Sequence, residues 1–301
     1  MRPAKTTLLF ITGIAFITIL AISPITIQNR ETILYASTTT SLYNTGLLDY
    51  LASNYRKTIG EKVDINFIAV GSGEALERAA RGDVCLVFVH APRLEAKYLA
   101  NGTLTHHHII AYNYFAIVGP TNDPAGVNQS HNTIEAFTKI VKAGNEGKAI
   151  FVSRGDRSGT NLKEKEIWDK VGYVPSPDTD KWYIVSGQGM SNTLLIAEEL
   201  KAYTLTDTGT FLKLKKEGQL PHLQILYTES PDLINIYSVY LVSTCEGRQR
   251  NVSLDFIHYI VNHQNLIAAY GISEYGQPLF YPAKDSIEWL QEKWSEITAQ
   301  G

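Results

Sequence analysis

The sequence has little cysteine. Its 301 residues include two, Cys85 and Cys245, which stand far apart in apolar stretches. Zinc sites need closely spaced ligands, and these two residues do not provide such spacing. One isolated disulfide and a pair of buried thiols both fit the pattern, and we favour two buried thiols. No metal centre is expected from them.

An excess of basic residues is also absent. Lys and Arg number 27 against 30 for Asp and Glu, which gives a net charge of −3. Proteins that bind nucleic acid normally carry a basic patch or stripe, so no nucleic-acid partner is expected. With 44% hydrophobic and 19% charged residues, the composition is typical of a globular protein with one large or two medium domains.

Common catalytic motifs are missing as well. The chain contains no Gly-x-Ser-x-Gly elbow, no His-Glu-x-x-His pair and no Gly-x-x-x-x-Gly-Lys-Ser/Thr loop. We therefore expect a binding protein, with no enzymatic activity and no cofactor. A hydrolase that uses Ser72 as nucleophile and His90 as base remains an alternative.

Residues 1–30 differ from the rest of the chain. Arg2 and Lys5 precede an uncharged run from Thr6 to Ile27. A basic start followed by an apolar core is typical of a secretory signal, yet this run is long enough to span a bilayer. We predict either a signal peptide or an N-terminal membrane anchor and favour the anchor. The remainder is then extracytoplasmic, and three sequons fit this location: Asn101, Asn128 and Asn251.

Short apolar runs alternate with helical patterns from residue 31 onward, which favours an α/β fold with a largely parallel sheet. We predict two lobes: residues 31–112 with about 238–301 form lobe 1, and residues 113–237 form lobe 2. The predicted strands are 32–36, 63–70, 84–89, 112–118, 149–152, 183–186, 202–205, 223–227 and 236–242. The predicted helices are 47–55, 74–81, 132–143, 162–168, 193–200, 254–268 and 287–297.

Small polar residues follow three of the predicted strands of lobe 1. These turns are Thr38-Thr39-Thr40-Ser41, Gly71-Ser72-Gly73 and His90-Ala91. In open α/β sheets, ligands bind outside the carboxyl ends of the strands, so the three turns should face one crevice. Hydroxyls and glycine-flanked backbone N–H groups are suited to holding an anion.

Residues 153–160 read Ser-Arg-Gly-Asp-Arg-Ser-Gly-Thr and lie between a predicted strand and a predicted helix. The N-terminus of a helix offers free N–H groups and a positive dipole end, which suits an oxyanion. We expect Arg154 to point into the crevice and Arg157 to be solvated or paired with Asp156. An ordinary capped helix, with Ser158 or Thr160 as the N-cap, is the alternative.

Other polar residues have two interpretations each. Gln188 and Met190 either line the crevice or cap and pack a helix. Asp207 either orients Arg154 or caps a helix. His106-His107-His108 resembles a metal-binding tract, but consecutive side chains of an extended segment alternate in direction, so we expect a surface loop.

Six sequence blocks, taken in order, resemble those of one family. They are Ser-Thr-Thr-Thr-Ser, Ala-Val-Gly-Ser-Gly-Glu-Ala-Leu, Leu-Val-Phe-Val-His-Ala-Pro, Phe-Val-Ser-Arg-Gly-Asp-Arg-Ser-Gly-Thr, Ser-Gly-Gln-Gly-Met and Ala-Tyr-Thr-Leu-Thr-Asp-Thr-Gly-Thr. From about residue 33 to 282 the chain resembles the tungstate-binding proteins of ABC importers. The resemblance implies the type II periplasmic-binding-protein fold, in which two α/β lobes close around an oxyanion. It also implies an ABC permease as partner, and we expect a monomer.

The resemblance further implies a set of ligand contacts: Thr39, Thr40, Ser41, Ser72, Arg154, Ser158, Gly159 and Thr160. Which of Thr38 to Ser41 touch the ligand stays open. Phosphate binders place an aspartate, which accepts a proton from the ligand, near the position of His90. Tungstate is unprotonated near neutral pH, so His90 either donates one hydrogen bond or has a structural role. Molybdate, phosphate and vanadate are alternative ligands, and a sensory ectodomain is an alternative function.

Overall fold

The computed structural model describes residues 31–59 and 62–299. The predicted signal or anchor at residues 1–30 lies outside the described residues. Among the described residues, no helix combines the length and apolar character that crossing a bilayer requires.

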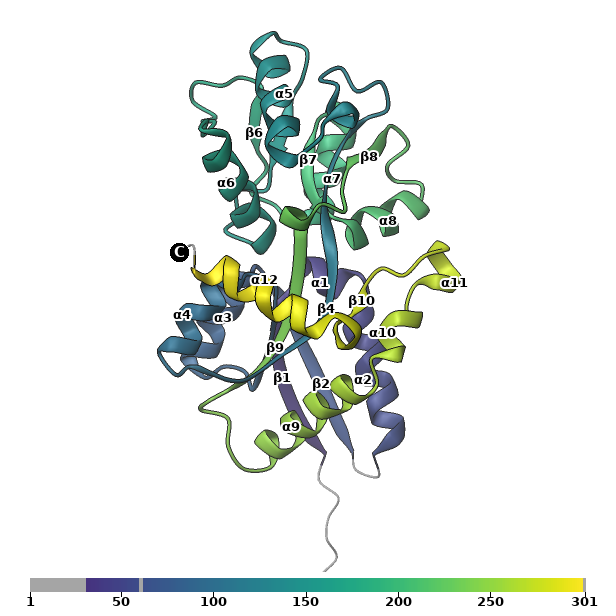
Figure 1. Cartoon of the computed structure of the whole chain (residues 1–301). Coiled ribbons are helices and arrows are strands. Elements are labelled where there is room, and N and C mark those ends of the chain that lie inside the picture. Colours follow the sequence, from purple (N-terminus) through teal and green to yellow (C-terminus); the bar gives the residue numbers. More distant parts are fainter. Residues whose placement is uncertain (1–30, 60–61, 300–301) are drawn as a thin grey trace, which may run out of the picture. The chain divides into compact units, whose positions relative to one another are not determined.

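Helices and strands alternate through most of the chain (Figure 1). The first part contains β1 (Thr32–Thr39), α1 (Thr40–Asn44), α2 (Leu47–Thr58), β2 (Val63–Val70), α3 (Ser72–Arg81), β3 (Leu86–Val89), α4 (Pro92–Ala100) and β4 (Leu104–Pro120). The middle contains η1 (Val127–Gln129), α5 (Thr133–Asn145), β5 (Phe151–Ser153), α6 (Gly159–Val171), β6 (Tyr183–Val185), α7 (Met190–Leu200), β7 (Thr204–Asp207), α8 (Thr208–Lys216), β8 (Leu223–Tyr227) and η2 (Pro231–Leu233). The last part contains β9 (Ile234–Val242), α9 (Gly247–Asn262), α10 (Asn265–Ala269), α11 (Ile272–Tyr275), β10 (Tyr281–Pro282), η3 (Ala283–Ser286) and α12 (Ile287–Ala299).

The main sheet is mixed, so the prediction of a largely parallel sheet is wrong. Its hydrogen-bonded order is β10, β4, β9, β3, β1, β2, and β7 and β8 also pair with β4. The β1–β2 and β1–β3 pairs are parallel, whereas β9 runs antiparallel to both β3 and β4. All nine side chains of β9 are buried. A strand that is apolar on both faces shows no alternation, and its pattern does not reveal its direction.

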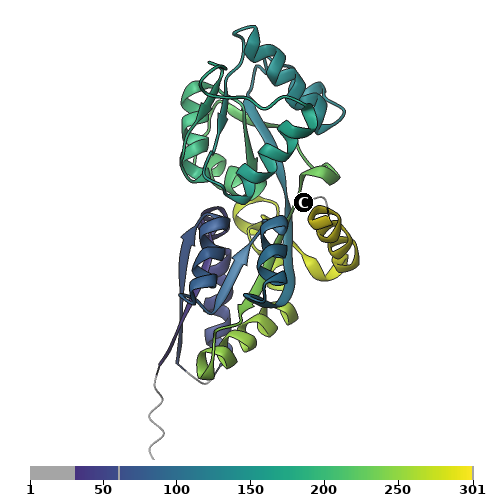
Figure 2. The same cartoon turned by 90° about the vertical axis from the view of Figure 1, so that its left-hand side faces the viewer.

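Strand β4 changes partners along its length. Its residues up to Tyr114 pair with β9, whereas Phe115 to Pro120 pair with β7 and β8. Figures 1 and 2 show the long strands β4 and β9 between the two groups of elements. We propose this change of partner as the lobe boundary and call residues 32–114 with 234–299 the first lobe, and 115–233 the second lobe.

Both faces of the first-lobe sheet are covered by helices. In β3, Leu86 and Phe88 pack with α2 and α9, whereas Val87 and Val89 pack with α3 and α4. The alternation follows from the pleat of the strand, which sends successive side chains to opposite faces. Burial on both faces fixes the carboxyl ends of β1 and β3, and therefore the turns that follow them.

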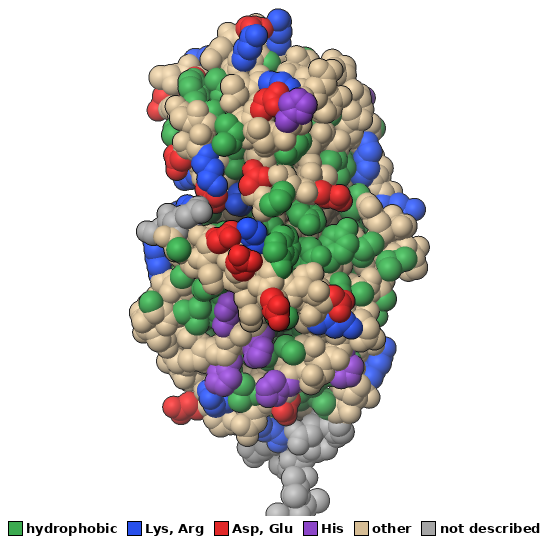
Figure 3. Space-filling model, in the orientation of Figure 1, with side chains coloured by type: hydrophobic (Ala, Val, Ile, Leu, Met, Phe, Trp, Pro, Cys, Tyr) green, Lys and Arg blue, Asp and Glu red, His purple; other side chains and the backbone are tan. Residues whose placement is uncertain are grey.

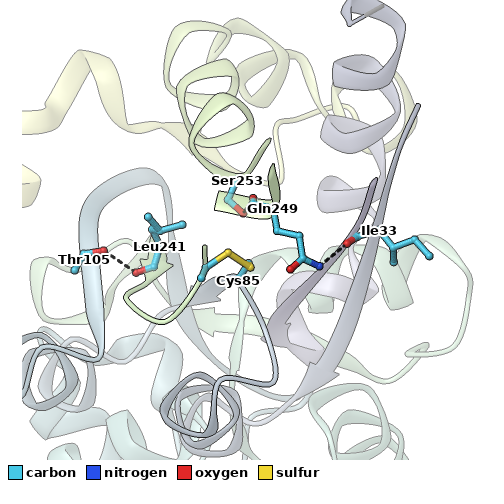
Figure 4. The surroundings of a disulfide bond; sticks show 7 residues. Ile33, Cys85, Thr105, Leu241, Gln249 and Ser253 are labelled. Carbon is cyan, nitrogen blue, oxygen red and sulfur yellow. Dashed lines mark hydrogen bonds between the residues drawn. A yellow bond between two sulfur atoms is a disulfide. The ribbon is translucent and has the colours of Figure 1, made fainter. Parts of the chain in front are cut away.

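A disulfide joins Cys85 to Cys245, so the expectation of two buried thiols is wrong. Their Cα atoms lie 5.1 Å apart although 160 residues separate them in sequence. Cys85 directly precedes β3 and Cys245 directly precedes Glu246, the N-cap of α9. Figure 4 shows the bond beside the Gln249 side chain, whose amide donates to the carbonyl of Ile33. The sequence does not reveal this pairing because β9 returns next to β3 only after the whole second lobe.

The histidine run lies in a strand, so the expected surface loop is wrong. His106 and His107 fall in β4 at a register shift, where His106 has a positive φ of 51°. His107 is partly buried. Its Nε2 forms a hydrogen bond with Ser238 Oγ at 3.0 Å, and its ring stacks on Tyr240. Figure 3 shows several histidines gathered on the first-lobe part of this face. The described residues contain no group of three or more His, Cys, Asp or Glu side chains that fits a metal ion.

Acid is expected to destabilise the fold partly through His107. Burial, with a smaller contribution from His108, lowers the pKa of His107 from 6.5 to about 4. The unfolded chain therefore binds the proton more readily than the folded chain. Stabilisation by the neutral ring is complete above about pH 6.5 and is lost as the pH falls towards about 4.

Urea unfolding at about pH 7.5 and about pH 5 measures this effect. The free energy of unfolding should fall less with acid in His107→Gln than in the wild type. His131→Gln, which changes an exposed histidine, serves as the control and should behave as the wild type does. An equal fall in all three proteins would contradict the assignment.

Candidate functional site

The turns that follow β1, β2 and β5 come together, as predicted. Arg154 Nη2 lies 3.5 Å from Thr40 Oγ1, which brings the loop after β5 against the turn after β1. A Cβ atom added to Gly71 would lie 3.7 Å from the carbonyl oxygen of Asp156, so the turn after β2 meets the same loop. The loop after β5 therefore meets both other turns, and we call the place where they meet the crevice.

Two helices begin at this crevice. Ser72 is the first residue of the ten-residue helix α3, and Ser158 is the N-cap of the thirteen-residue helix α6. Ser158 Oγ accepts from the N–H of Asn161 at 3.2 Å, which leaves its own hydrogen free to donate. The first N–H groups of a helix have no partner within it, and the dipole makes this end positive. Both features favour an anion.

Several buried donors at the crevice have no hydrogen-bond partner. They are Ser72 Oγ, Thr160 Oγ1 and Arg154 Nε. All three side chains are almost completely buried, and that of Arg154 is 2% exposed. Burying a polar group without a partner costs roughly 1–3 kcal/mol, and more for a charged group. Three unpaired donors from two turns, the one after β2 and the one after β5, are explained if one acceptor-rich ligand satisfies them together.

Arg154 pairs with Asp156, and of the two expectations for Arg157, solvated or paired with Asp156, the structure has the solvated one. The Nη2 to Oδ2 distance is 2.5 Å, and Asp156 Oδ1 accepts from the N–H of Ser158 at 3.1 Å. The side chain of Arg157 is exposed at a φ of 58°, and its N–H donates to Asn161 Oδ1. The positive φ turns Arg157 away from the aspartate, which is free to orient Arg154.

Asp207 caps a helix. Its carboxylate accepts from the N–H and the hydroxyl of Thr210 at 2.8 and 2.7 Å, at the start of α8. Burial raises the pKa of Asp207, and the nearby charge of Arg154 opposes that rise. The interaction with Arg154 is thus electrostatic, while the direct contacts of Asp207 are those of a cap.

His90 is buried between the lobes as a neutral ring. Burial is the main cause that lowers its pKa from 6.5 to about 4, and the charge of Arg154 adds to it. Its Nδ1 lies 2.7 Å from Asn235 Oδ1, and its Nε2 lies 3.3 Å from Ser41 Oγ. Asn113 lies next to Asn235, with 2.9 Å between their amides. Sequence reasoning missed both asparagines, although an amide within the apolar run of β9 was a signal.

Thr38 and Thr39 are the last two residues of β1. Thr39 is the N-cap of α1, and its Oγ1 accepts from the N–H of Leu42. The side chains of Leu34 and Ala36 face the core. Thr38 follows Ala36 by two positions, so it lies on the same face of β1. Its hydroxyl is buried without a partner.

The turn before α7 meets α1 at Gly189. Gln188 is exposed, and its N–H donates to Ser186 Oγ. Met190 belongs to the core of the second lobe, so of its two interpretations the structure has the packing one. Between them, a Cβ added to Gly189 would lie 3.6 Å from Thr40 Oγ1, which places this turn against α1.

A cavity of about 280 Å³ adjoins the crevice at His90 and Gly159. It lies between α4 of the first lobe and α6 of the second. Basic side chains that line it are Arg93, Lys97, Lys163 and Lys165, together with the acidic Glu166 and Asp169. This cavity therefore lies beside the crevice and between the lobes, and its lining has more basic than acidic side chains.

Gly159 lies directly against His90 of the first lobe. A Cβ atom there would lie 2.7 Å from the carbonyl oxygen of His90 and 2.9 Å from its ring. Gly159→Ala should therefore keep the lobes apart and weaken ligand binding roughly 5- to 150-fold, the equivalent of an overpacking cost of about 1–3 kcal/mol. Isothermal titration measures the loss.

Gly189→Ala is the matched control, because its Cβ would meet Thr40 at an ordinary contact distance of 3.6 Å and its φ is −63°. Its affinity should stay within about threefold of the wild type, a change below 1 kcal/mol. If both alanine variants bind as tightly as the wild type, the close approach at Gly159 has no part in binding.

Comparison with known proteins gives a consistent assignment. Residues 27–264 match the model of the PBP superfamily domain. The chain is 36% identical over 261 residues to the tungstate-binding protein TupA of Peptoclostridium acidaminophilum, which covers 85% of this chain and 87% of that protein. The crystal structure of the tungstate ABC transporter from Geobacter sulfurreducens is 37% identical, covers 79% of this chain and 98% of its own, and superposes with a TM-score of 0.69.

A second structure, the tungstate-binding protein TupA from Desulfovibrio alaskensis G20, is 36% identical and also has a TM-score of 0.69. It covers 83% of this chain and 98% of its own. These matches confirm the expected type II periplasmic-binding-protein fold. The chain therefore belongs to the PBP superfamily and, within it, to the family of the TupA tungstate-binding proteins.

Proposed function

We propose that this protein captures tungstate outside the cytoplasm and delivers it to an ABC permease. The observation that carries the proposal is the group of buried, unpaired donors on Ser72, Arg154 and Thr160. They come from both lobes and border one crevice, as a clamp around an anion requires. The names of the related proteins supply the choice of tungstate among oxyanions.

The proposed contacts come from two sides of the crevice. The first lobe supplies Thr40 and Ser72, and the second supplies Arg154 with the start of α6, where Ser158, Gly159 and Thr160 lie. Hydrogen bonds to a charged group contribute about 1.5–3 kcal/mol each. Roughly six of them reach the free energy of about −12 kcal/mol that corresponds to nanomolar affinity, even after some ordering cost.

Isothermal titration of the extracytoplasmic domain with tungstate, molybdate, phosphate and vanadate tests the proposal. We expect one site per chain and a monomer, with tungstate and molybdate displacing phosphate. An unprotonated dianion fits a site whose unpaired side-chain groups, two hydroxyls and a guanidinium N–H, can all donate. The absence of tungstate heat at micromolar protein would refute the ligand, and tighter binding of phosphate would reassign it.

A hydrolase is the second candidate, because Ser41, His90 and Asn235 form a hydroxyl, imidazole and amide sequence. A nucleophile, a base and an orienting group have this order in acyl transfer. However, the pKa of His90 is about 4, which makes it a weak base at neutral pH. Hydrolysis of p-nitrophenyl esters by the wild type that disappears in Ser41→Ala would support this candidate. If the wild type leaves these esters intact, binding alone is supported.

A further inference from the structure

A chain of side-chain hydrogen bonds runs from the strands between the lobes to α1. Asn113 and Asn235 face each other in the register of β4 and β9, and Asn235 Nδ2 donates to Asn113 Oδ1 at 2.9 Å. The chain continues through His90 to Ser41. It ends at Thr39, whose Oγ1 lies 3.3 Å from Ser41 Oγ.

The hydrogen bonds in this chain have one direction. Asn235 Nδ2 donates both to Asn113 Oδ1 and to the hydroxyl of Tyr237, so Asn235 Oδ1 is the acceptor that faces His90. Rotating the amide of Asn235 would set two carbonyl oxygens against each other. His90 must then carry its hydrogen on Nδ1, and in the neutral ring Nε2 keeps a lone pair. Ser41 therefore donates its hydroxyl hydrogen to Nε2.

The next bonds follow from that donation. Since the hydrogen of Ser41 is used by His90, Thr39 is the donor between the two hydroxyls. Thr39 Oγ1 also accepts from the N–H of Leu42, so this hydroxyl acts as both donor and acceptor within the protein. The residue between them, Thr40, then presents its hydroxyl to Arg154 of the second lobe.

His90 contacts elements of both lobes. Its ring stacks on Tyr237 of β9 with centroids 4.9 Å apart, and it bonds Ser41 of α1. Its carbonyl oxygen and ring also bound the space at Gly159, the first residue of α6. One side chain thus joins β9, one jaw of the clamp and the helix that begins the other.

We propose that His90 is a positioning residue of the anion site: held by Asn235, it accepts the hydroxyl of Ser41 and so sets the position of Thr40 opposite Arg154. The inference rests on the proposed function and adds to it a residue that does not touch the ligand. It also removes Ser41 from the predicted contacts, because the hydroxyl hydrogen of Ser41 points to His90.

Two variants separate the bonds of the ring. His90→Asn keeps a donor near the place of Nδ1 and loses the acceptor for Ser41, whereas His90→Gln can keep that acceptor and loses the donor to Asn235. In isothermal titration, His90→Asn should lose roughly tenfold or more in tungstate affinity, the effect of leaving a buried hydroxyl unpaired. His90→Gln should lose clearly less affinity than His90→Asn, because it can still accept from Ser41.

Thermal unfolding without tungstate provides the second readout, since both variants lose the stacking on Tyr237 and should melt at lower temperature. A purely structural role predicts affinity losses that follow the losses of stability. Equal affinities in the two variants would overturn the proposal. Failure of the wild type to bind tungstate would instead overturn the proposed function.

The ring itself is tested without any ligand. In ¹H–¹⁵N correlation spectra of the histidine rings near neutral pH, the signals that vanish in His90→Gln belong to His90. They should show a protonated Nδ1 and an unprotonated Nε2. A hydrogen on Nε2 would reverse the direction of the bonds and refute the positioning role, whether or not tungstate binds.

Discussion

Arg154→Ala is expected to weaken tungstate binding by about 2–5 kcal/mol, the cost of removing one partner of a buried charge pair. Arg154 is buried, its Nε has no protein partner, and its Nη2 contacts Asp156 and Thr40. Alanine removes the charge that attracts the anion. It also leaves the carboxylate of Asp156 unpaired near a dianion, so repulsion adds to the lost hydrogen bond.

Isothermal titration of three further variants separates these effects. Arg157→Gln removes a positive charge from the same loop, but from an exposed side chain, and should change the affinity less than threefold or about 0.6 kcal/mol. Arg154→Ala combined with Asp156→Asn should recover part of the loss because the repulsion is gone. Arg154→Lys keeps the charge without the fork and should bind between wild type and alanine. An affinity of Arg154→Ala equal to that of the wild type would exclude a role for this residue.

Removal of the disulfide has the largest expected effect on stability. Cys85 and Cys245 have a sequence separation of 160, and opening the bond should lower the free energy of unfolding by about 2–5 kcal/mol. The bond restricts a long loop in the unfolded chain, and it joins two segments of the first lobe. Tungstate affinity should be preserved, because Cys85 and His90 stand at opposite ends of β3, roughly 16 Å apart along the strand.

Denaturant unfolding of the double variant Cys85→Ala and Cys245→Ala, compared with oxidised and reduced wild type, measures this contribution. The double variant and the reduced protein should agree with each other. Equal stability of all three proteins would show that the bond is dispensable. A parallel loss of tungstate affinity would show that the first lobe needs the bond to hold its turns in place.

The site was easier to predict from the sequence than the sheet. The turns after β1, β2 and β5 combine glycine, hydroxyl and arginine with the start of a helix, and this chemistry is local. The strands 63–70 and 223–227 also have the predicted bounds, because turn residues flank them. By contrast, the direction of β9 and the bond between Cys85 and Cys245 depend on partners that are distant in sequence.

Local rules failed at several helices and at the histidine run. Helices α1, α4, α8 and α11 are not among the predicted helices. The first three begin close to the end of a strand, where the polar residues also fit a ligand turn. His106-His107-His108 has neither alternation nor β-branched residues, yet pairing with β9 makes it part of β4. The bonds between Asn113, Asn235 and His90 require β9 to lie beside β4, which no local pattern indicates.

The place of β9 in the sheet has a consequence for synthesis on the ribosome. Tyr114 and Ile234, which flank the second lobe, are register partners, so residues 115–233 form an insertion with adjacent ends. Strand β9 lies between β3 and β4, and the first-lobe sheet stays incomplete until Val242 has emerged. The second lobe needs no later residue to complete its strands, so all of its residues are synthesised before β9. The strands β1 to β3 therefore remain without β9 until the second lobe has been made.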